Sequence, residues 1–396
     1  MTNFERVALY ALLISITALS LDMLLPLLPT IAQEFKSSDS NQIYFVISAV
    51  IFGMIFGEII FGPLADAIGR KPALIIGLAV FLFGTIIALT AHNLTWLLIG
   101  RAIQGIGVSG PKIATRALIR DQFQAAQMAR MMSMVFFMLI GVTMLAPILG
   151  QWLGNALGWR SIFYFYLIIT FVAGGWLLLR HKETLPRNAR TPLLLKEMLK
   201  NLNLILKNGR VLSYTCIAGL VFGAQLTFLS VAQSIFDKTY GRADSFVYWV
   251  AALSLCIGLS SLLNSYLVMR KPMDYLVGFA LSGLGFIGAI LFTFSQVSDT
   301  YPPFIVFITA TAFAFGCIGT VFGNINAMAM TYLGRVAGLG ASVISSVSSL
   351  IAFALAAFMS QIHDGTPFAL SICFMIAGLG GLTALIMARQ LDEISV

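Results

Sequence analysis

The sequence contains very little charge. Only 10% of its 396 residues are Asp, Glu, Lys or Arg, whereas a soluble globular domain carries about 25%. Apolar residues make up 59% of the chain, and the mean hydropathy is +0.93. These values exclude an ordinary water-soluble protein. Because the apolar runs are continuous and close to the roughly 20 residues that a helix needs to cross a bilayer, we predict an all-α membrane protein.

Residues that support metal or enzyme chemistry are also scarce. The three histidines all fall in predicted loops: His92, His181 and His363. The four cysteines each stand alone in a different apolar run: Cys216, Cys256, Cys317 and Cys373. No CxxC, HExxH or GxSxG motif occurs. Since metal and hydrolase sites need such groupings, we expect no metal site and no enzyme activity.

The sequence gives no support for a nucleotide-binding site either. GxxxxGK[ST] is absent, so direct drive by ATP is not expected. Two GxGxxG matches lie at 105–110 and 283–288, but neither follows a strand of a βαβ unit. Glycines at this spacing inside apolar spans allow helices to pack closely instead. We therefore predict no cofactor.

Charges and loop breakers divide the chain into twelve predicted spans. They cover residues 7–31, 43–65, 73–90, 94–119, 131–152, 160–179, 211–236, 247–268, 275–294, 304–327, 339–361 and 367–388. The segment Met1–Glu5 leads straight into the first span, so no cleavable signal peptide is expected.

The distribution of Lys and Arg predicts the orientation. If the N-terminus is cytoplasmic, 18 of the 24 basic residues fall on that side and four on the other. The remaining two, Arg101 and Lys112, lie within the fourth span. Because cytoplasmic loops are enriched in Lys and Arg, both termini are predicted to be cytoplasmic. We expect a multi-pass protein of the bacterial cytoplasmic (inner) membrane.

The two halves of the chain resemble each other. "RKPALIIGLAVFLFG" begins at Arg70 and "RKPMDYLVGFALSGLG" at Arg270, each opening an odd-numbered span. Such a repeat predicts two six-helix bundles, 1–180 and 211–396, joined by a basic cytoplasmic linker at 181–210. The linker includes 193–206, which is either an amphipathic surface helix or simply part of a basic connection.

One short stretch has a specific pattern. "GPLADAIGRKPAL" at 62–74 contains Gly62, Asp66, Gly69 and Arg70 in a predicted loop. It resembles the signature loop of the major facilitator superfamily, G-x-L-A-D-x-x-G-R-[KR], except that Ala67 replaces the usual basic residue. The resemblance implies a conformational latch on the cytoplasmic side, and Asp66, Arg70 and Asp121 are the candidates for it.

Further motifs narrow the resemblance. "RAIQGIG" at 101–107 resembles the arginine motif of the fourth span, and "SLDMLLPLLPTIA" at 20–32 is similar to the first span of Bcr/CflA-like multidrug exporters, a branch of the twelve-helix drug:proton antiporters. "GVTMLAPILGQWLG" at 141–154 resembles the antiporter motif, with Ala146 and Gln151 in place of two glycines. Its motif residues are Gly141, Pro147, Gly150 and Gly154. The second half is matched by topology and by "AGLGAS" at 337–342.

Two charges lie deep within predicted spans. Asp22 lies about 22 Å from the cytoplasmic end of its helix, and Arg101 about 10 Å from the opposite end, so both are near one level. An unpaired charge at such a depth costs about 2.5–3.5 kcal/mol on insertion scales. Burial opposes ionisation of a carboxyl group, whereas a nearby guanidinium favours it. The pair is therefore either a proton-coupling site or a static structural pair.

Other polar residues within spans allow more than one interpretation. Glu58 and Lys112 either pair with each other or offer a cationic contact to an anionic substrate. The remaining group either lines a substrate cavity or joins helices by hydrogen bonds: Gln104, Gln225, Asn264, Asn324 and Asn326.

Together these features predict a secondary transporter that exports amphipathic drugs or small metabolites by alternating access, driven by protons. The alternative is a transporter of an anionic metabolite or carboxylate siderophore, in either direction. A passive channel or membrane receptor is the remaining class. The expected partners are a small-molecule substrate, protons and the lipid bilayer, with no nucleic acid, and the expected state is a monomer.

Overall fold

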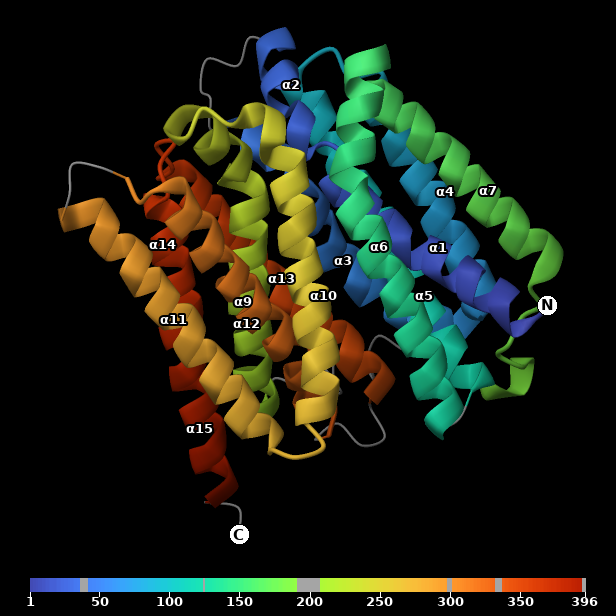
Figure 1. The fold of residues 1–396 in the computed structure, drawn as a ribbon. Helices are drawn as coiled ribbons and strands as arrows, with labels where there is room; N and C mark the ends of the chain where they lie inside the picture. Colours follow the sequence, from blue (N-terminus) through green and yellow to red (C-terminus); the bar gives the residue numbers. More distant parts are fainter. Residues whose placement is uncertain (36–41, 124, 191–206, 298–300, 332–336, 394–396) are drawn as a thin grey trace. The chain divides into compact units, whose positions relative to one another are not determined.

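The structure is a computed structural model of an all-helical chain (Figure 1). It describes residues 1–35, 42–123, 125–190, 207–297, 301–331 and 337–393. The predicted amphipathic stretch 193–206 lies outside these ranges. The chain divides into two compact units, Met1–Lys200 and Asn201–Val396. The division falls inside the predicted linker.

The helices of each unit follow one another with short connections. Unit 1 contains α1 (Asn3–Asp22), α2 (Leu28–Glu34), α3 (Phe45–Ile68), α4 (Arg70–Leu89), α5 (Leu94–Gln122), α6 (Ala125–Leu157) and α7 (Ser161–Arg180). Unit 2 contains α9 (Gly209–Ser234), α10 (Phe246–Leu267), α11 (Met273–Val297), α12 (Phe304–Thr331), α13 (Ala337–Gln361), α14 (Phe368–Met375) and α15 (Gly381–Glu393). A π-helical turn at Ile376–Gly380 joins α14 to α15.

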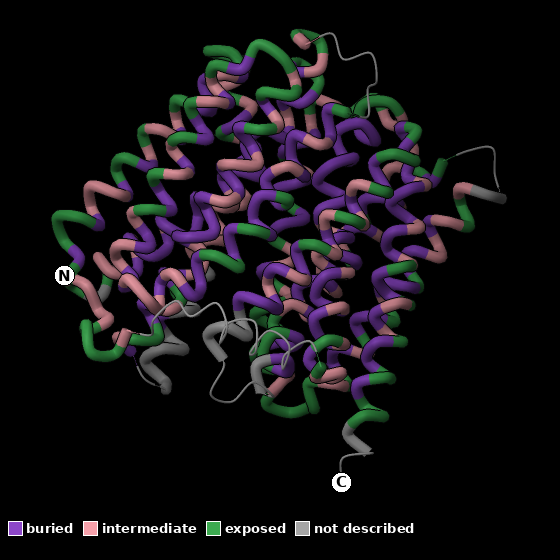
Figure 2. Tube along the Cα trace, turned by 180° about the vertical axis from the view of Figure 1, so that it is seen from behind, coloured by how far each residue is buried: buried purple, intermediate pink, exposed green. Residues whose placement is uncertain are grey.

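Most of the predicted spans are confirmed as helices long and apolar enough to cross a membrane. Eleven such helices occur within the described residues. The predicted span 94–119 corresponds to α5, which has 29 residues but a lower hydropathy, since Arg101 and Lys112 lie inside it. Large apolar side chains remain exposed on many helices, including Phe83, Phe171 and Phe313. Figure 2 shows buried and exposed residues alternating along the helices, as packing on one side requires.

The first predicted span is not one continuous helix. α1 ends at Asp22, a 3-10 turn covers Leu25–Leu27, and α2 then begins at Leu28. Pro26 and Pro29 occupy the starts of the last two elements. Proline lacks a backbone N–H, and two prolines three residues apart remove hydrogen bonds from successive turns, which accounts for the break just after Asp22.

The predicted signature loop is also largely helical. α3 continues through Asp66 to Ile68, and α4 begins at Arg70, so Gly69 alone forms the connection. Gly69 has a φ of 111°, a backbone conformation that residues with a Cβ rarely adopt. A loop was the wrong prediction because one glycine reverses the chain direction here.

Glycines bring the helices of unit 1 into backbone contact. A Cβ on Gly53 would lie 1.8 Å from the Ala102 carbonyl oxygen, and one on Gly105 would lie 1.9 Å from that of Val50. A Cβ on Gly107 would lie 2.2 Å from the amide nitrogen of Phe81. The GxGxxG match at 105–110 therefore packs α5 against α3 and α4, as predicted for glycines inside spans.

Glycines also bring helices of unit 2 into close contact. A Cβ on Gly378 would lie 2.2 Å from the amide nitrogen of Gly285, in the second GxGxxG match. α9 and α13 run parallel, because contacts at Gly219 with Ile351 and at Gly223 with Leu355 advance together along both helices.

Candidate functional site

The carboxyl group of Asp22 lies at the break in the first span. Asp22 is the last residue of α1, and only 5% of it is exposed. Within the described residues, no hydrogen bond or ion pair joins its side chain to another group. A buried carboxyl group without a cationic partner is costly to ionise in a low-dielectric environment.

Arg101 is the largest fully buried side chain of the region, with no exposed surface. Its Nε donates to the Val46 carbonyl oxygen at 3.1 Å, and its Nη2 donates to the Ser20 carbonyl oxygen. Its Nη1 donates to Gln104 Oε1 at 2.8 Å, and Gln104 Nε2 donates to Thr85 Oγ1 at 2.7 Å. From α5, this network therefore reaches α1, α3 and α4.

The expected pairing of Asp22 with Arg101 is not what the structure contains. Arg101 donates to the carbonyl oxygen of Ser20, two residues before Asp22, so the two residues do lie near one level. No ion pair joins them. The guanidinium is already occupied by backbone carbonyls near the C-terminal end of α1, where the negative end of the helix dipole attracts a cation.

A tyrosine that the sequence did not single out completes this arrangement. Tyr166, on α7, is 1% exposed, and its hydroxyl donates to the Leu19 carbonyl oxygen at 2.8 Å. Tyr166 and Arg101 thus bind consecutive carbonyls just before Asp22. A tyrosine inside an apolar helix carries no sequence signal of this role, because its partner is a backbone atom.

The antiporter motif brings α6 against the same break. A Cβ on Gly150 would lie 2.0 Å from the Met23 carbonyl oxygen, and one on Gly154 would lie 2.4 Å from the Leu27 side chain. Pro147 is buried inside α6, whereas a Cβ on Gly141 would meet nothing within 4 Å. Two of the four motif positions therefore contact the segment that follows Asp22.

Glu58 and Lys112 form an ion pair between α3 and α5. Lys112 Nζ lies 2.5 Å from Glu58 Oε1, with the Glu58 side chain fully buried and the Lys112 side chain 16% exposed. Of the two interpretations of these residues, the structure contains the pair.

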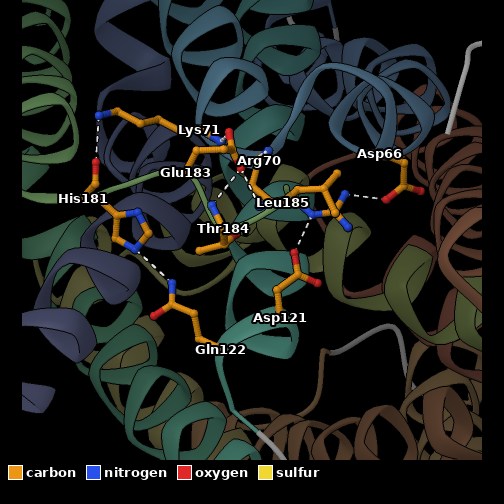
Figure 3. Close-up of polar contacts among 9 residues, drawn as sticks. All are labelled: Asp66, Arg70, Lys71, Asp121, Gln122, His181, Glu183, Thr184 and Leu185. Atoms are coloured by element: carbon orange, nitrogen blue, oxygen red, sulfur yellow. Dashed lines mark hydrogen bonds and ion pairs between the residues drawn. The ribbon is translucent and has the colours of Figure 1, made fainter. Parts of the chain in front are cut away.

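The latch candidates of the signature region gather around one arginine. Arg70 Nε lies 2.8 Å from Asp121 Oδ2, and its Nη1 pairs with Asp66. Figure 3 shows the Arg70 guanidinium between the two carboxylates, which come from the ends of α3 and α5. Arg70 is 3% exposed. Gly62 lies buried one turn before Asp66 in α3. Asp66 and Arg70 of the motif thus lie together with Asp121, and their role as a latch stays a prediction.

The remaining cavity candidates separate into two groups. Gln104 is bonded at both ends of its amide, and Asn324 exchanges hydrogen bonds with Asn264 at 2.7 and 3.2 Å, joining α12 to α10. Gln225 is half-buried on α9, while Asn326 is exposed and donates to the Phe322 carbonyl oxygen. Gln225 and Asn326 are the candidates left to contact a substrate.

Asn324→Ala should lower the melting temperature of the purified protein. The variant leaves the buried Asn264 amide without its partner, a loss of about 0.6–1.7 kcal/mol for helix pairs in membranes. Asn326→Ala, two residues away and exposed, is the matched control and should leave the melting temperature unchanged. Equal shifts in both variants would mean that the amide pair does not hold these helices together.

The buried His363 of unit 2 is expected to make its stability depend on pH. It lies between α13 and α14 and is 4% exposed. Burial lowers the pKa of His363 from 6.5 to about 4, assisted by Lys238 and opposed by Asp364. Folding therefore favours the neutral imidazole. Its contribution to the free energy of unfolding is complete above pH 6.5, the pKa of the unfolded state, and is lost as the pH falls towards 4.

The melting temperature should accordingly fall between pH 7 and pH 5, and His363→Gln should reduce that fall by a few degrees. The contribution of one group is at most about 1.4 kcal/mol per pH unit. His92→Gln, at an exposed position, should leave the slope unchanged. A wild-type slope in the His363 variant would contradict this assignment.

Within the part of the chain that the structure describes, no group of three or more His, Cys, Asp or Glu side chains is placed to hold a metal ion. The described candidates are the buried carboxyl group of Asp22, the helix break held by Arg101 and Tyr166, the Glu58–Lys112 ion pair and the Arg70 cluster.

Comparisons with known proteins fit this geometry. Residues 10–357 match the family model described as Major Facilitator Superfamily. The chain is 25% identical over 363 residues to a bicyclomycin resistance protein homolog of Haemophilus influenzae, covering 90% of each protein. It is 26% identical over 263 residues to multidrug resistance protein D of Escherichia coli, covering 63% of this chain and 66% of that protein. A crystal structure of a D-xylose–proton symporter superposes with a TM-score of 0.78 at 15% identity, covering 97% of both chains.

Proposed function

The chain belongs to the Major Facilitator Superfamily, and from that premise we propose that it exports amphipathic small molecules in exchange for protons. It is a multi-pass membrane transporter, not an enzyme, and the predicted resemblance to Bcr/CflA-like exporters is confirmed by its multidrug-resistance relatives. The direction of transport, the coupling ion and the substrate class are the proposed part.

The observation that carries the proposal is the environment of Asp22. Among the residues that the structure describes, its buried carboxyl group has no ion-pair partner, while Arg101 and Tyr166 hold the backbone immediately before it. Such a group binds a proton while shielded and releases it when water reaches it. Exposure to opposite sides of the membrane in turn would make Asp22 the carrier of the coupling proton.

The signature region supports alternating access in this proposal. The Asp66–Arg70–Asp121 cluster is a compact ionic arrangement at the junction of α3 and α4, where the superfamily's latch resides. We further propose that this end of the protein is cytoplasmic, that the two units act as six-helix bundles in the bacterial inner membrane, and that the transporter works as a monomer.

The ion pair of Lys112 argues for amphipathic rather than anionic substrates. The lysine that favoured an anionic ligand is neutralised by Glu58 at 2.5 Å. Gln225 and Asn326 offer uncharged hydrogen-bonding groups instead, which suits ligands with one polar end.

Charge reversal tests the role of the pair. Glu58→Lys or Lys112→Glu alone places like charges in a buried contact, which should cost about 3–5 kcal/mol and sharply reduce folded protein. The double reversal should restore at least half of the yield and of the transport rate. A double variant as defective as either single one would contradict a structural pair and return Lys112 to the list of substrate contacts.

The proposal is tested by proton release from the purified protein in weak buffer. Amphipathic cationic dyes should displace protons on binding, whereas citrate-like carboxylates should not. Release caused only by carboxylates would favour an anion transporter. Absence of release with every compound, together with saturable dye binding, would rule out a proton as the coupling ion.

A further inference from the structure

The segment that leaves α7 lies across the start of α4. We call residues 181–185 the strap. Glu183 accepts hydrogen bonds from the backbone amides of Arg70 at 3.0 Å and Lys71 at 3.1 Å, and from Thr184 and Leu185 at 2.8 and 2.9 Å. Figure 3 shows its carboxylate between the strap and the first turn of α4.

The strap supplies the N-terminal cap that α4 lacks. The first amides of a helix have no partner within the helix, and a side-chain oxygen normally binds them. The residue at the cap position, Gly69, has no side chain. Glu183 binds the first two amides, Pro72 has none, and Ala73 donates to the Gly69 carbonyl oxygen. The start of α4 is therefore fully satisfied, with a negative charge at the positive end of its dipole.

Lys71, in the first turn of α4, binds the C-terminal end of α7. Its Nζ donates to the carbonyl oxygens of Leu178 at 3.0 Å and His181 at 2.7 Å. A cation thus lies at the negative end of α7 while an anion lies at the positive end of α4. The two helix ends stabilise each other through opposite charges.

The other side of the strap contacts the helix that provides Asp121. The His181 ring lies 2.9 Å from the Tyr10 hydroxyl and 3.0 Å from Gln122 Nε2. Gln122 is the neighbour of Asp121 at the end of α5. The strap therefore holds both the helix start that carries Arg70 and the helix end that carries its partner.

Gly69 makes this contact sterically possible. A Cβ at position 69 would lie 2.5 Å from Glu183 Oε2, in addition to the strain of its positive φ. The positive φ of the chain reversal requires the glycine, and the lack of a Cβ also leaves room for the carboxylate.

We propose that Glu183 is a positioning residue for the Asp66–Arg70–Asp121 cluster. By capping α4 it fixes Arg70 between the two carboxylates, and it ties the strap to the cluster. The consequence for the transport cycle rests on the proposed function, whereas the cap itself does not. Through the strap, the end of α7 is then coupled to the latch.

Hydrogen exchange on the full-length protein tests the cap directly. In Glu183→Gln, the amides of Arg70 and Lys71 should exchange about tenfold faster or more, because bonds to a charged acceptor are lost or weakened. Glu5→Gln is the matched control: Glu5 pairs with Arg180 at 2.8 Å but touches no α4 amide, so exchange at Arg70 and Lys71 should stay unchanged. Unchanged exchange in the Glu183 variant would overturn the proposal.

A double-variant comparison guards against simple misfolding. Gly69→Ala should lower the melting temperature strongly in the wild-type background and less in the Glu183→Ala background, where the clash with the carboxylate is absent. Additive shifts would show that the two residues do not meet.

Transport kinetics separate positioning from binding. Glu183→Gln should lower the maximal rate severalfold with an unchanged KM, since the substrate-contact candidates lie elsewhere. A raised KM at an unchanged maximal rate would contradict the positioning role. If amide exchange in Glu183→Gln is faster and transport proves independent of protons, the assignment of Glu183 as the cap stands and only the proposed proton coupling is wrong.

Discussion

Asp22→Asn should abolish uphill transport while leaving the protein folded. Asparagine has nearly the same shape, so contacts around the helix break persist, but its amide does not exchange a proton in this pH range. In the described part of the chain, the carboxyl group has no ionic partner whose loss would leave a second buried charge. We therefore expect the melting temperature to change little or to rise.

The measurement uses proteoliposomes with an imposed pH gradient and a cationic dye. The wild type should concentrate dye against its gradient, and Asp22→Asn should reach only the equilibrium distribution. Substrate-induced proton release should fall to the background. Asp244→Asn, at an exposed position, should behave as the wild type. Uphill transport by Asp22→Asn at even a tenth of the normal rate would assign the proton to another group.

Gly150→Ala should have the largest structural effect of any single methyl addition in the antiporter motif. The new Cβ would lie 2.0 Å from the Met23 carbonyl oxygen, and this backbone atom cannot move without shifting the break that holds Asp22. Overpacking of this kind costs about 1–3 kcal/mol or more. We expect a marked fall in melting temperature and a loss of most transport.

The same motif provides its own control. Gly141→Ala adds the same methyl group where nothing lies within 4 Å. Alanine in place of a glycine inside a helix stabilises by about 0.5–1 kcal/mol, so this variant should be as stable as the wild type or slightly more so. If the two variants have similar effects, α6 does not approach the break as described.

The positions of the helices were largely predictable, because long apolar runs between charges mark membrane spans without reference to tertiary contacts. The motif indicated Asp66 and Arg70, and the cost of leaving two charges alone in adjoining helices made the Glu58–Lys112 pair one of the two interpretations. In each case the decisive information lay in residue type and spacing.

The rest depended on contacts with backbone atoms, which no residue pattern displays. Arg101 and Tyr166 bind carbonyl oxygens near the end of α1, and Glu183 binds amides 113 and 112 positions earlier in the chain. The break after Asp22 was missed for a different reason: the prolines were visible, but hydropathy stays high across them and suggested one continuous span.

The cap on α4 also has a consequence for how the protein is made. During synthesis, Arg70 leaves the ribosome long before Glu183, so α4 is made before the carboxylate that caps its first two amides exists. A nascent chain released after Arg180 would possess α1 to α7 and still lack the carboxylate that caps α4. The segment needed to complete α4 therefore extends past α7, and a fragment designed to end at residue 180 should mature less completely than one ending at 190.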